Sequence, residues 1–323
     1  MKLEEIGFYT LCDKRAEEIS ESSPMWRCEM ILTDKCNFSC SYCRKMRPEC
    51  QGRMATAEAI HRTNLWAKDG LKHIRYSGGE PTLHTDLIKI VKNAKSQGID
   101  RIALSTNGSA SHDLYLSLVR AGVNDFSISL DACCSTLGDA MSGSTGQYNN
   151  VITNIRLLSR LTYVTVGVVI TEDNLYEVNE TIEFAHNLGV ADIRIISAAQ
   201  FNEILESVTE VSDEILDAHP ILKYRVNNMR EERNVRGLSE NDSHKCYLLN
   251  DDSVIGGDYH FPCIIYMREG GDPVGKVNQN MRKDRIEFFE TFDTHLDPIC
   301  QKNCLDVCID FNNRCESFKT IEV

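Results

Sequence analysis

The chain has 323 residues, of which 42% are hydrophobic and 26% charged, so it can bury the core of one large α/β domain and a smaller one. Its formal net charge of −13 opposes binding to nucleic-acid phosphates, and no basic stretch is long enough to reverse that field. No apolar run reaches the length of a membrane span, and the N-terminus lacks a signal-peptide pattern, so we expect a cytoplasmic protein without membrane or nucleic-acid partners.

Short β-branched runs alternate with amphipathic segments of helical period from about residue 26 to 197. The predicted strands are 28–33, 73–77, 101–105, 125–130, 163–170 and 191–197, and the predicted helices are about 56–68, 84–97, 112–121, 147–160 and 174–187. Six βα units are too few for a closed eight-fold barrel, so we expect a partial (β/α)6 TIM-like barrel with function at the carboxyl ends of its strands. His73, His84 and His112 stand where these elements begin, and we expect them to cap helices or lie on the surface.

The alternation stops after about residue 200, and a polar, charge-rich stretch at 230–245 leads into a cysteine-rich tail. We therefore predict an N-terminal extension (1–25), a partial barrel (26–221) and a small C-terminal domain (222–323). The chain has 14 cysteines, and in a long cytosolic protein clustered cysteines indicate metal binding or chemistry rather than disulfides.

A C-x3-C-x2-C loop formed by Cys36, Cys40 and Cys43 follows directly on the first predicted strand. Three thiolates can hold three corners of a [4Fe–4S] cluster and leave the fourth iron open to another ligand. A structural zinc site would usually supply four ligands, and zinc is the alternative interpretation of this spacing.

This loop, with Tyr42 before its last cysteine, resembles the signature of the radical S-adenosylmethionine (SAM) superfamily. Further motifs of that superfamily follow in order at the ends of the later strands: Gly78-Gly79-Glu80-Pro81, Ser105-Thr106-Asn107-Gly108, Ser129-Leu130-Asp131, Val169 to Asn174, and Arg194 to Ser197. The resemblance covers about residues 26–200 and supports the partial-barrel prediction.

The resemblance implies that residues from each of these motifs bind SAM. Those expected to bind SAM are Tyr42, Gly78, Gly79, Glu80, Pro81, Ser105, Asn107, Ser129, Asp131, Val169 and Arg194. The second-strand motif would hold the amino group of SAM, the third- and fourth-strand motifs its carboxylate and ribose, and the last two its adenine or methionyl group. The implied activity is reductive cleavage of SAM to a 5′-deoxyadenosyl radical, which abstracts a hydrogen atom from a substrate. A flavodoxin- or ferredoxin-type protein is the implied electron donor.

The tail carries six cysteines, the first two of which bracket the pair Gly256-Gly257: Cys246, Cys263, Cys300, Cys304, Cys308 and Cys315. This arrangement resembles the SPASM and twitch extensions of radical SAM enzymes, which hold auxiliary [4Fe–4S] clusters and open with a cysteine, a glycine-containing β-hairpin and a second cysteine. One auxiliary cluster, on the first two cysteines and two of the next three, fits the count better than two clusters. A structural zinc in the tail is the alternative, with Cys315 a buried free thiol.

Two adjacent cysteines, Cys133 and Cys134, follow Asp131 at the mouth of the predicted barrel. A thiol there could return a hydrogen atom to a substrate radical, which would imply epimerisation or reduction, so both are candidate catalytic residues. Simple packing in a βα loop is the alternative.

The substrate is less clearly indicated than the superfamily. Relatives with such tails carry out alcohol oxidation, peptide crosslinking, epimerisation or decarboxylation. The roughly 25 residues before the first strand are too short for a peptide-recognition domain, which favours a small polar metabolite such as a sugar, aminocyclitol or nucleotide over a ribosomally made peptide. The barrel motifs also resemble molybdenum-cofactor cyclases, but those end in two glycines and this chain ends Thr-Ile-Glu-Val. A non-catalytic zinc-binding scaffold is the alternative from another class.

Overall fold

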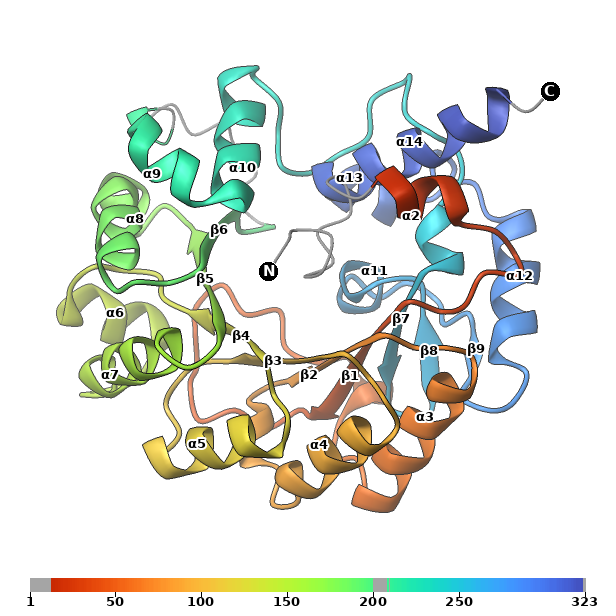
Figure 1. The fold of residues 1–323 in the computed structure, drawn as a ribbon. Coiled ribbons are helices and arrows are strands. Elements are labelled where there is room, and N and C mark those ends of the chain that lie inside the picture. Colours follow the sequence, from red (N-terminus) through yellow and green to blue (C-terminus); the bar gives the residue numbers. More distant parts are fainter. Residues whose placement is uncertain (1–12, 200–207, 209, 322–323) are drawn as a thin grey trace. The chain divides into compact units, whose positions relative to one another are not determined.

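The computed structural model describes residues 13–199, 208 and 210–321, and these residues form two compact units (Figure 1). The first unit takes the described residues up to 35, then 45–102 and those from 236 onward. The second unit takes residues 36–44 and the described part of 103–235. The chain leaves the first unit twice and returns to it, so neither unit is a continuous stretch of sequence.

The second unit is built on parallel strands that follow one another in the order β3-β4-β5-β6. These are β3 (Arg101–Thr106, of which Ala103 onward belongs here), β4 (Asp125–Ser129), β5 (Tyr163–Ile170) and β6 (Asp192–Ser197). Its helices are α5 (His112–Ala121), α6 (Ser135–Ser142), α7 (Tyr148–Ser159), α8 (Val178–Asn187), α9 (Asp213–Ala218) and α10 (Pro220–Arg230), with a 3-10 turn η4 (Leu175–Glu177). Helix α10 spans the predicted domain boundary near residue 222 and packs against β6.

The first unit contains the strands in the order β2-β1-β7-β8-β9. These are β1 (Arg27–Thr33), β2 (His73–Gly78), β7 (Asp252–Gly256), β8 (Tyr259–Phe261) and β9 (Gly275–Lys276). Its helices are α2 (Asp13–Glu18), α3 (Thr56–Lys68), α4 (Leu87–Ser96), α11 (Ile264–Arg268), α12 (Met281–Thr291), α13 (Pro298–Asn303) and α14 (Asp306–Ile321), with 3-10 turns η2 (Pro48–Cys50), η3 (Pro81–Leu83) and η6 (Tyr247–Asn250). Strand β7 pairs in parallel with β1 and antiparallel with β8, so the tail extends the sheet by a hairpin. No helix among the described residues is long and apolar enough to cross a membrane.

The six sequence-predicted strands are all present, with each end within one residue of the prediction. The predicted helices 56–68 and 112–121 coincide with α3 and α5. The helix predicted from 84 begins only at Leu87, because η3 and a turn at His84 precede it. Two glycines that stand two residues after the ends of α4 and α8, Gly98 and Gly189, have positive φ angles of 78° and 77°, as suits the end of a helix.

The two faces of the first-unit sheet differ in what covers them. On β2, Ile74 and Tyr76 are buried on the side of α3, where the Tyr76 hydroxyl lies 3.5 Å from the Thr63 hydroxyl. Because side chains alternate along a strand, His73, Arg75 and Ser77 point to the opposite side. That second face lies opposite α3 and is itself largely covered, because His73 and Ser77 are buried on it.

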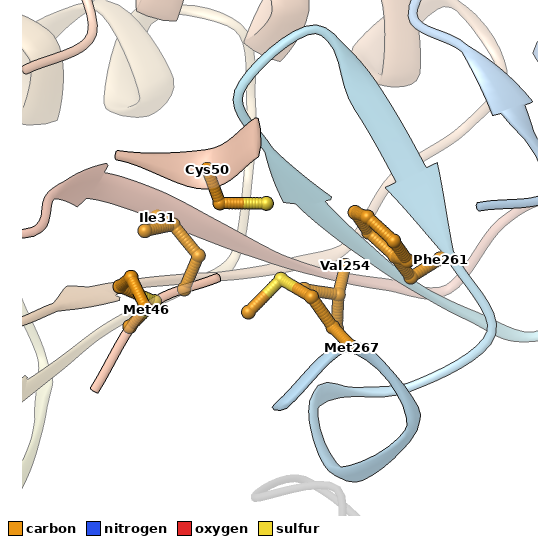
Figure 2. Close-up of a cluster of buried hydrophobic side chains, with 6 residues drawn as sticks. All are labelled: Ile31, Met46, Cys50, Val254, Phe261 and Met267. Carbon is orange, nitrogen blue, oxygen red and sulfur yellow. The ribbon is translucent and has the colours of Figure 1, made fainter. Parts of the chain in front are cut away.

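The tail hairpin packs onto the segment that follows the cysteine loop (Figure 2). The buried cluster consists of Ile31, Met46, Cys50, Val254, Phe261 and Met267. Gly256 lies so close to this cluster that an added Cβ would be 2.8 Å from both the Cys50 and Met267 sulfurs. At Gly257, with φ of 55°, a Cβ would lie 2.1 Å from the Glu49 carbonyl oxygen. The glycine-containing hairpin expected between Cys246 and Cys263 is thus confirmed, and glycine is needed there for close approach.

Histidine burial departs from the sequence-based expectation. His84 fits a capping role, because its ring accepts a hydrogen bond from the Asp86 N–H (3.2 Å) just before α4. The expectation for His73 is wrong, because it lies in β2, is 9% exposed and has its ring 5.6 Å from that of Trp26. Burial, reinforced by the charges of surrounding arginines, lowers the pKa of His73 to about 2. Burial likewise lowers the pKa of His219 to about 4 and that of His260 to about 3.

We expect the contribution of three buried histidines to the free energy of unfolding to fall as the pH drops below about 6.5, the ordinary histidine pKa. The unfolded chain then binds protons that the folded chain rejects at His73, His219 and His260, so this stability is complete above that pH and is lost toward acid. Each neutral buried histidine contributes a slope of up to about 1.4 kcal/mol per pH unit. Urea unfolding at pH 7.5, 6 and 5 measures the change. His73→Phe should reduce the slope, whereas the exposed His61→Gln should not; equal slopes for all three proteins would contradict the neutral burial of His73.

Candidate functional site

The cysteine loop of the second unit is anchored on the C-terminal end of α6. The Ser39 N–H donates to the Ser142 carbonyl (2.9 Å), and the Ser39 hydroxyl donates to the Gly143 carbonyl (3.3 Å). Gly143 caps α6 in the left-handed conformation, with φ of 58°, and an added Cβ would lie 2.3 Å from the Ser39 Oγ. Glycine at this position therefore allows α6 to end directly against the loop.

The three thiols of the loop lie near one another in a partly open position. Cys36 and Cys43 are exposed and Cys40 is half-buried. Burial, with smaller contributions from the charges of Asp131, Cys43 and Cys36, raises the pKa of the Cys40 thiol to about 11 against a hydrogen bond with Tyr42 that lowers it. Mutually repelling thiolates need a compensating positive charge, which bound iron supplies.

A buried hydrogen-bond network ties the loop to the ends of β4 and β5. The Tyr42 hydroxyl donates to one oxygen of the Asp131 carboxylate, and the Val169 N–H donates to the other (2.8 Å). The Asn174 side-chain amide donates to the Asp131 and Val169 carbonyls, both at 2.9 Å. Burial raises the pKa of Asp131 to about 6 against the hydrogen bond from Tyr42. Asp131, predicted to contact SAM, thus has both carboxylate oxygens engaged in holding Tyr42 and β5.

The end of β3 reaches the first cysteine through Asn107. Its side-chain amide donates to the Asn37 side-chain oxygen (2.9 Å) and approaches the Cys36 sulfur at 3.8 Å. Its own side-chain oxygen accepts from the Ser109 N–H (3.0 Å), which fixes the turn after β3. The structure therefore brings Asn107 to the cysteine loop, and it adds Asn37 and Ser109, which the sequence did not single out.

The remaining predicted SAM contacts of the second unit lie on its strands. Ser105 is half-buried in β3, and Ser129 is exposed at the end of β4. Arg194 on β6 donates to the Ser127 hydroxyl at 3.3 Å, across β5, where Gly167 leaves space for its guanidinium. Arg194 is therefore positioned by the strands themselves.

The Gly78-Gly79-Glu80-Pro81 motif belongs to the first unit and lies against the end of β1. The Gly79 N–H donates to the Thr33 carbonyl (2.7 Å), and the Glu80 N–H donates to the Lys35 carbonyl (2.8 Å). An added Cβ at Gly79 would lie 2.3 Å from the Lys35 carbonyl oxygen, so only glycine permits this approach. Glu80 is fully buried, and its carboxylate accepts from the Thr82 N–H (3.0 Å) and hydroxyl (2.6 Å).

Arg268 links this motif to the tail within the first unit. Its guanidinium donates to the Gly78 carbonyl at 3.3 Å. Arg268 ends the helix α11, whose N-cap is Cys263, where the sulfur accepts from the Tyr266 N–H at 3.3 Å. The sequence analysis missed Arg268, although its position five residues after a candidate ligand was a usable signal.

The tail gathers five cysteines in the first unit. They are Cys246, Cys263, Cys300, Cys304 and Cys308, all of which are half-buried. Burial raises the pKa of Cys246 to about 12 and that of Cys263 to about 11, and the pKa of Cys304 is raised by burial and by the charges of the four other thiols. Arg285 lies fully buried beside them and donates to the carbonyls of Leu249 (2.7 Å) and Phe261 (3.1 Å). Its charge opposes the mutual repulsion of the thiolates.

Within the described residues, no group of three or more His, Cys, Asp and Glu side chains is arranged to hold a single metal ion. The thiolates of a [4Fe–4S] cluster bind separate irons and do not converge on one ion. The two cysteine groups fit a cluster in donor type and in mutual electrostatic contact. Cys315 is completely buried in α14, as expected for a free thiol.

The adjacent thiols Cys133 and Cys134 both face one carboxylate of the second unit. Their sulfurs lie 3.8 Å and 4.0 Å from the same oxygen of Glu177, which ends η4. Burial and the Glu177 charge raise the pKa of Cys133, which favours its protonated form. The sequence analysis missed Glu177, although its position in the loop after the fifth strand was a usable signal.

The amino-acid sequence of residues 30–185 matches the family model of the radical SAM superfamily. The chain carries a radical SAM domain. The match starts within β1 and ends within α8. It therefore includes the cysteine loop, the contact of Gly79 with the end of β1 and the Tyr42–Asp131 hydrogen bond. Domains of this superfamily use a [4Fe–4S] cluster and SAM, which fits the open trio of thiols.

Curated relatives match little more than half of this chain. A probable GTP 3′,8-cyclase of Saccharolobus islandicus is 31% identical over 176 residues, or 54% of this chain and 57% of the relative. Molybdenum cofactor biosynthesis protein 1 of Drosophila melanogaster is 32% identical over 179 residues, or 53% of this chain and 31% of the relative. The chain thus spans little more than half the length of the first of these relatives.

Solved structures with this fold cover most of the chain. The structure of anSMEcpe with bound AdoMet aligns with a TM-score of 0.61 and 14% identity over 92% of this chain and 95% of that one. Streptococcus suis SuiB bound to the precursor peptide SuiA aligns with a TM-score of 0.58 and 14% identity over 90% of this chain and 69% of that one. At this identity the likeness concerns the fold alone. The predicted fold class, a mostly parallel and unclosed α/β barrel with a cysteine-rich tail, is confirmed.

Gly79→Ala should weaken SAM binding and destabilise the first unit. The new methyl group would press on the Lys35 carbonyl, and overpacking against backbone costs about 1–3 kcal/mol. Gly98→Ala is the control, because an added Cβ at Gly98 has nothing within 4 Å, so the substitution should cost only about 1 kcal/mol for its positive φ and leave SAM binding intact. Equilibrium dialysis with SAM and urea unfolding measure the two effects. Equal SAM affinity in both variants would show that the close contact of Gly79 with the Lys35 carbonyl is not needed for SAM binding.

Proposed function

We propose that this chain is a radical SAM enzyme that removes a hydrogen atom from a small polar metabolite such as a sugar, an aminocyclitol or a nucleotide. The observation that carries the proposal is the anchored loop of Cys36, Cys40 and Cys43, held by the Tyr42–Asp131 hydrogen bond in a domain of this superfamily. When bound, the [4Fe–4S] cluster supplies the electron for reductive cleavage of SAM, which yields the 5′-deoxyadenosyl radical.

The loop's own residues prepare the three thiols for iron. The Phe38 N–H donates to the Cys36 sulfur at 3.4 Å, and the Asn107 amide approaches the same sulfur at 3.8 Å. Hydrogen bonds to a coordinating sulfur stabilise the thiolate and tune the potential of a cluster. Tyr42 and Asp131 hold the loop in place rather than reacting.

The residues proposed to bind SAM have distinct tasks. The backbone of Gly79 lies against β1. Hydrogen bonds from Thr82 fix the orientation of the buried Glu80 carboxylate, which is suited to bind the ammonium group of SAM. Ser105, Ser129 and Arg194 offer polar groups on three strands of the second unit. Tyr42, Asn107, Asp131 and Val169 belong to the network that supports the cysteine loop.

The small-metabolite proposal is supported by the names of the matched relatives. The relatives from Saccharolobus islandicus are named as probable GTP 3′,8-cyclases, and GTP is a nucleotide. The named structure with a precursor peptide, Streptococcus suis SuiB, is similar in fold alone. Maturation of a ribosomal peptide is therefore the second outcome to test in a substrate screen.

We assign the tail to one auxiliary [4Fe–4S] cluster of the SPASM or twitch type. Cys246 and Cys263 are the proposed first two ligands, with two more from Cys300, Cys304 and Cys308. Its proposed role is to accept an electron or to bind the substrate. The fully buried Arg285 supports this site, because its positive charge lowers the pKa of Cys246 against the effect of burial.

Anaerobic reconstitution with iron and sulfide tests the two-cluster proposal. The wild-type chain should hold about eight irons and the Cys36/Cys40/Cys43→Ala variant about four, because each cluster contains four. With SAM and dithionite, only the wild type should form 5′-deoxyadenosine. A flavodoxin or ferredoxin should replace dithionite. A colourless protein that binds zinc and forms no 5′-deoxyadenosine would instead support the non-catalytic scaffold.

We further propose that Cys133, beside Cys134, returns a hydrogen atom to the substrate radical. The step breaks the S–H bond, forms a C–H bond and leaves a radical on the sulfur. An electron from the flavodoxin- or ferredoxin-type donor and a proton from Glu177 then convert that radical back to the thiol. A donor must keep its hydrogen near neutral pH, and the raised pKa of Cys133 meets that need. This role predicts epimerisation or reduction.

Deuterium incorporation tests this role with any metabolite that stimulates 5′-deoxyadenosine formation. In D2O the wild type should place one deuterium on carbon in the product, since thiol hydrogens exchange with solvent. Cys133→Ser should lose at least about 90% of product while still forming 5′-deoxyadenosine, a loss of about tenfold. Cys50→Ser, at a thiol packed in the hairpin core, controls for the loss of a cysteine. Unlabelled product from the wild type would exclude a thiol donor.

A further inference from the structure

Three polar side chains on the face of β1 and β2 opposite α3 are not used by the cysteine loop or by the SAM motifs. They are Glu29 on β1 and Arg75 and Ser77 on β2. Glu29 is the register partner of Arg75, so the two side chains lie next to each other on the same face. That face lies opposite Tyr76, which packs toward α3. Glu29 and Arg75 are both half-buried, which leaves them within reach of a ligand.

Arg75 has an unsatisfied guanidinium. Its Nε is buried without a hydrogen-bond partner, and among the described residues no hydrogen bond or ion pair to its guanidinium is found. The neighbouring Glu29 does not take this role, because its carboxylate accepts the Ser77 hydroxyl at 2.5 Å instead. A buried donor without a partner is costly, and buried charges are normally paired. The Arg75 guanidinium and the oriented Glu29 carboxylate thus lie side by side on this face, and each can form a further hydrogen bond to a ligand.

We propose that Glu29, Arg75 and Ser77 form the subsite that binds the polar end of the substrate. Arg75 takes an oxyanion, a carboxylate or a phosphate, and Glu29, oriented by Ser77, accepts a hydrogen bond from an adjacent hydroxyl or ammonium group. Neighbouring strands lie about 4.8 Å apart, so the two ligand groups are separated by a few bonds, as in an amino acid or a phosphorylated polyol. This assignment rests on the proposed function, because it specifies the substrate of that enzyme.

The position of the subsite along β2 suits this role. Ser77 directly precedes Gly78, the first residue of the motif proposed to bind SAM. One strand residue spans about 3.3 Å, so a ligand held by Arg75 and Glu29 lies within a few residues of that motif. The subsite therefore determines which end of a bifunctional metabolite is held beside that motif.

Binding of three probes to the reconstituted protein, without SAM or reductant, tests the proposal. Sulfate supplies an oxyanion without a donor, sn-glycerol 3-phosphate adds hydroxyl groups to a phosphate, and L-serine adds an ammonium group to a carboxylate. Isothermal titration should detect one of the two bifunctional probes more strongly than sulfate. Preference for glycerol phosphate identifies a phosphate substrate, and preference for serine identifies a carboxylate.

Matched variants separate the two charged groups. Arg75→Gln should weaken the preferred probe and sulfate by at least about tenfold, and Arg75→Lys should retain part of the affinity. Glu29→Gln should weaken the bifunctional probe but strengthen sulfate, because it removes a nearby negative charge. The exposed Arg53→Gln, whose guanidinium donates to the Thr85 hydroxyl, is the control and should change neither.

Two results would overturn the subsite: no probe binds the wild type at millimolar concentration, or Arg75→Gln and Arg75→Lys both bind as the wild type does. Unfolding curves establish that each variant is folded. Because these titrations do not depend on SAM cleavage, 5′-deoxyadenosine formation can stand while the subsite fails. Conversely, intact probe binding without any 5′-deoxyadenosine formation would remove the proposed enzyme while leaving the anion site.

Discussion

The hydrogen bond from the Tyr42 hydroxyl to the Asp131 carboxylate joins the irregular cysteine loop to the ordered ends of β4 and β5. A loop without regular structure has large conformational entropy, so three thiols keep a common arrangement only when the loop is held at several points. Ser39 provides a second attachment at the end of α6, and Asn37 a third through Asn107. Buried carboxylates are costly unless they are hydrogen-bonded, and Asp131 meets that condition by organising this loop.

The first unit combines the motif after β2 with the cysteine-rich tail in one packed body. Strand β7 extends the sheet beside β1, and its hairpin packs on Met46 and Cys50 (Figure 2). Arg268 connects the helix that starts at Cys263 to the Gly78 carbonyl. A substitution in the tail can therefore displace the glycine motif, because both share one core. The proposed auxiliary-cluster site and the glycine motif proposed to bind SAM therefore depend on the same packed core.

Local periodicity accounts for what was predictable in the fold. The six strands and helices such as α3 and α5 follow from alternating apolar runs and amphipathic segments, which are read from neighbouring residues. Helix α6 was missed, because its eight residues carry little apolar periodicity and include Gly138. Strand β7 was missed as a parallel partner of β1, because its partner lies more than 200 residues away in the sequence. The burial of His73 likewise depends on Trp26 and on arginines from distant segments.

The sequence by itself determined the chemistry: the spacing of Cys36, Cys40 and Cys43, the glycine motif after β2 and their order along alternating strands indicate a radical SAM domain, because these features are local and their order follows from chain connectivity. Only the tertiary structure decided which polar groups are already engaged. It showed that Asp131 holds Tyr42, that Glu177 faces two thiols, and that the Arg75 Nε has no hydrogen-bond partner among the described residues. Such relations depend on which side chains meet across strands and loops far apart in sequence, and no local pattern encodes those distances.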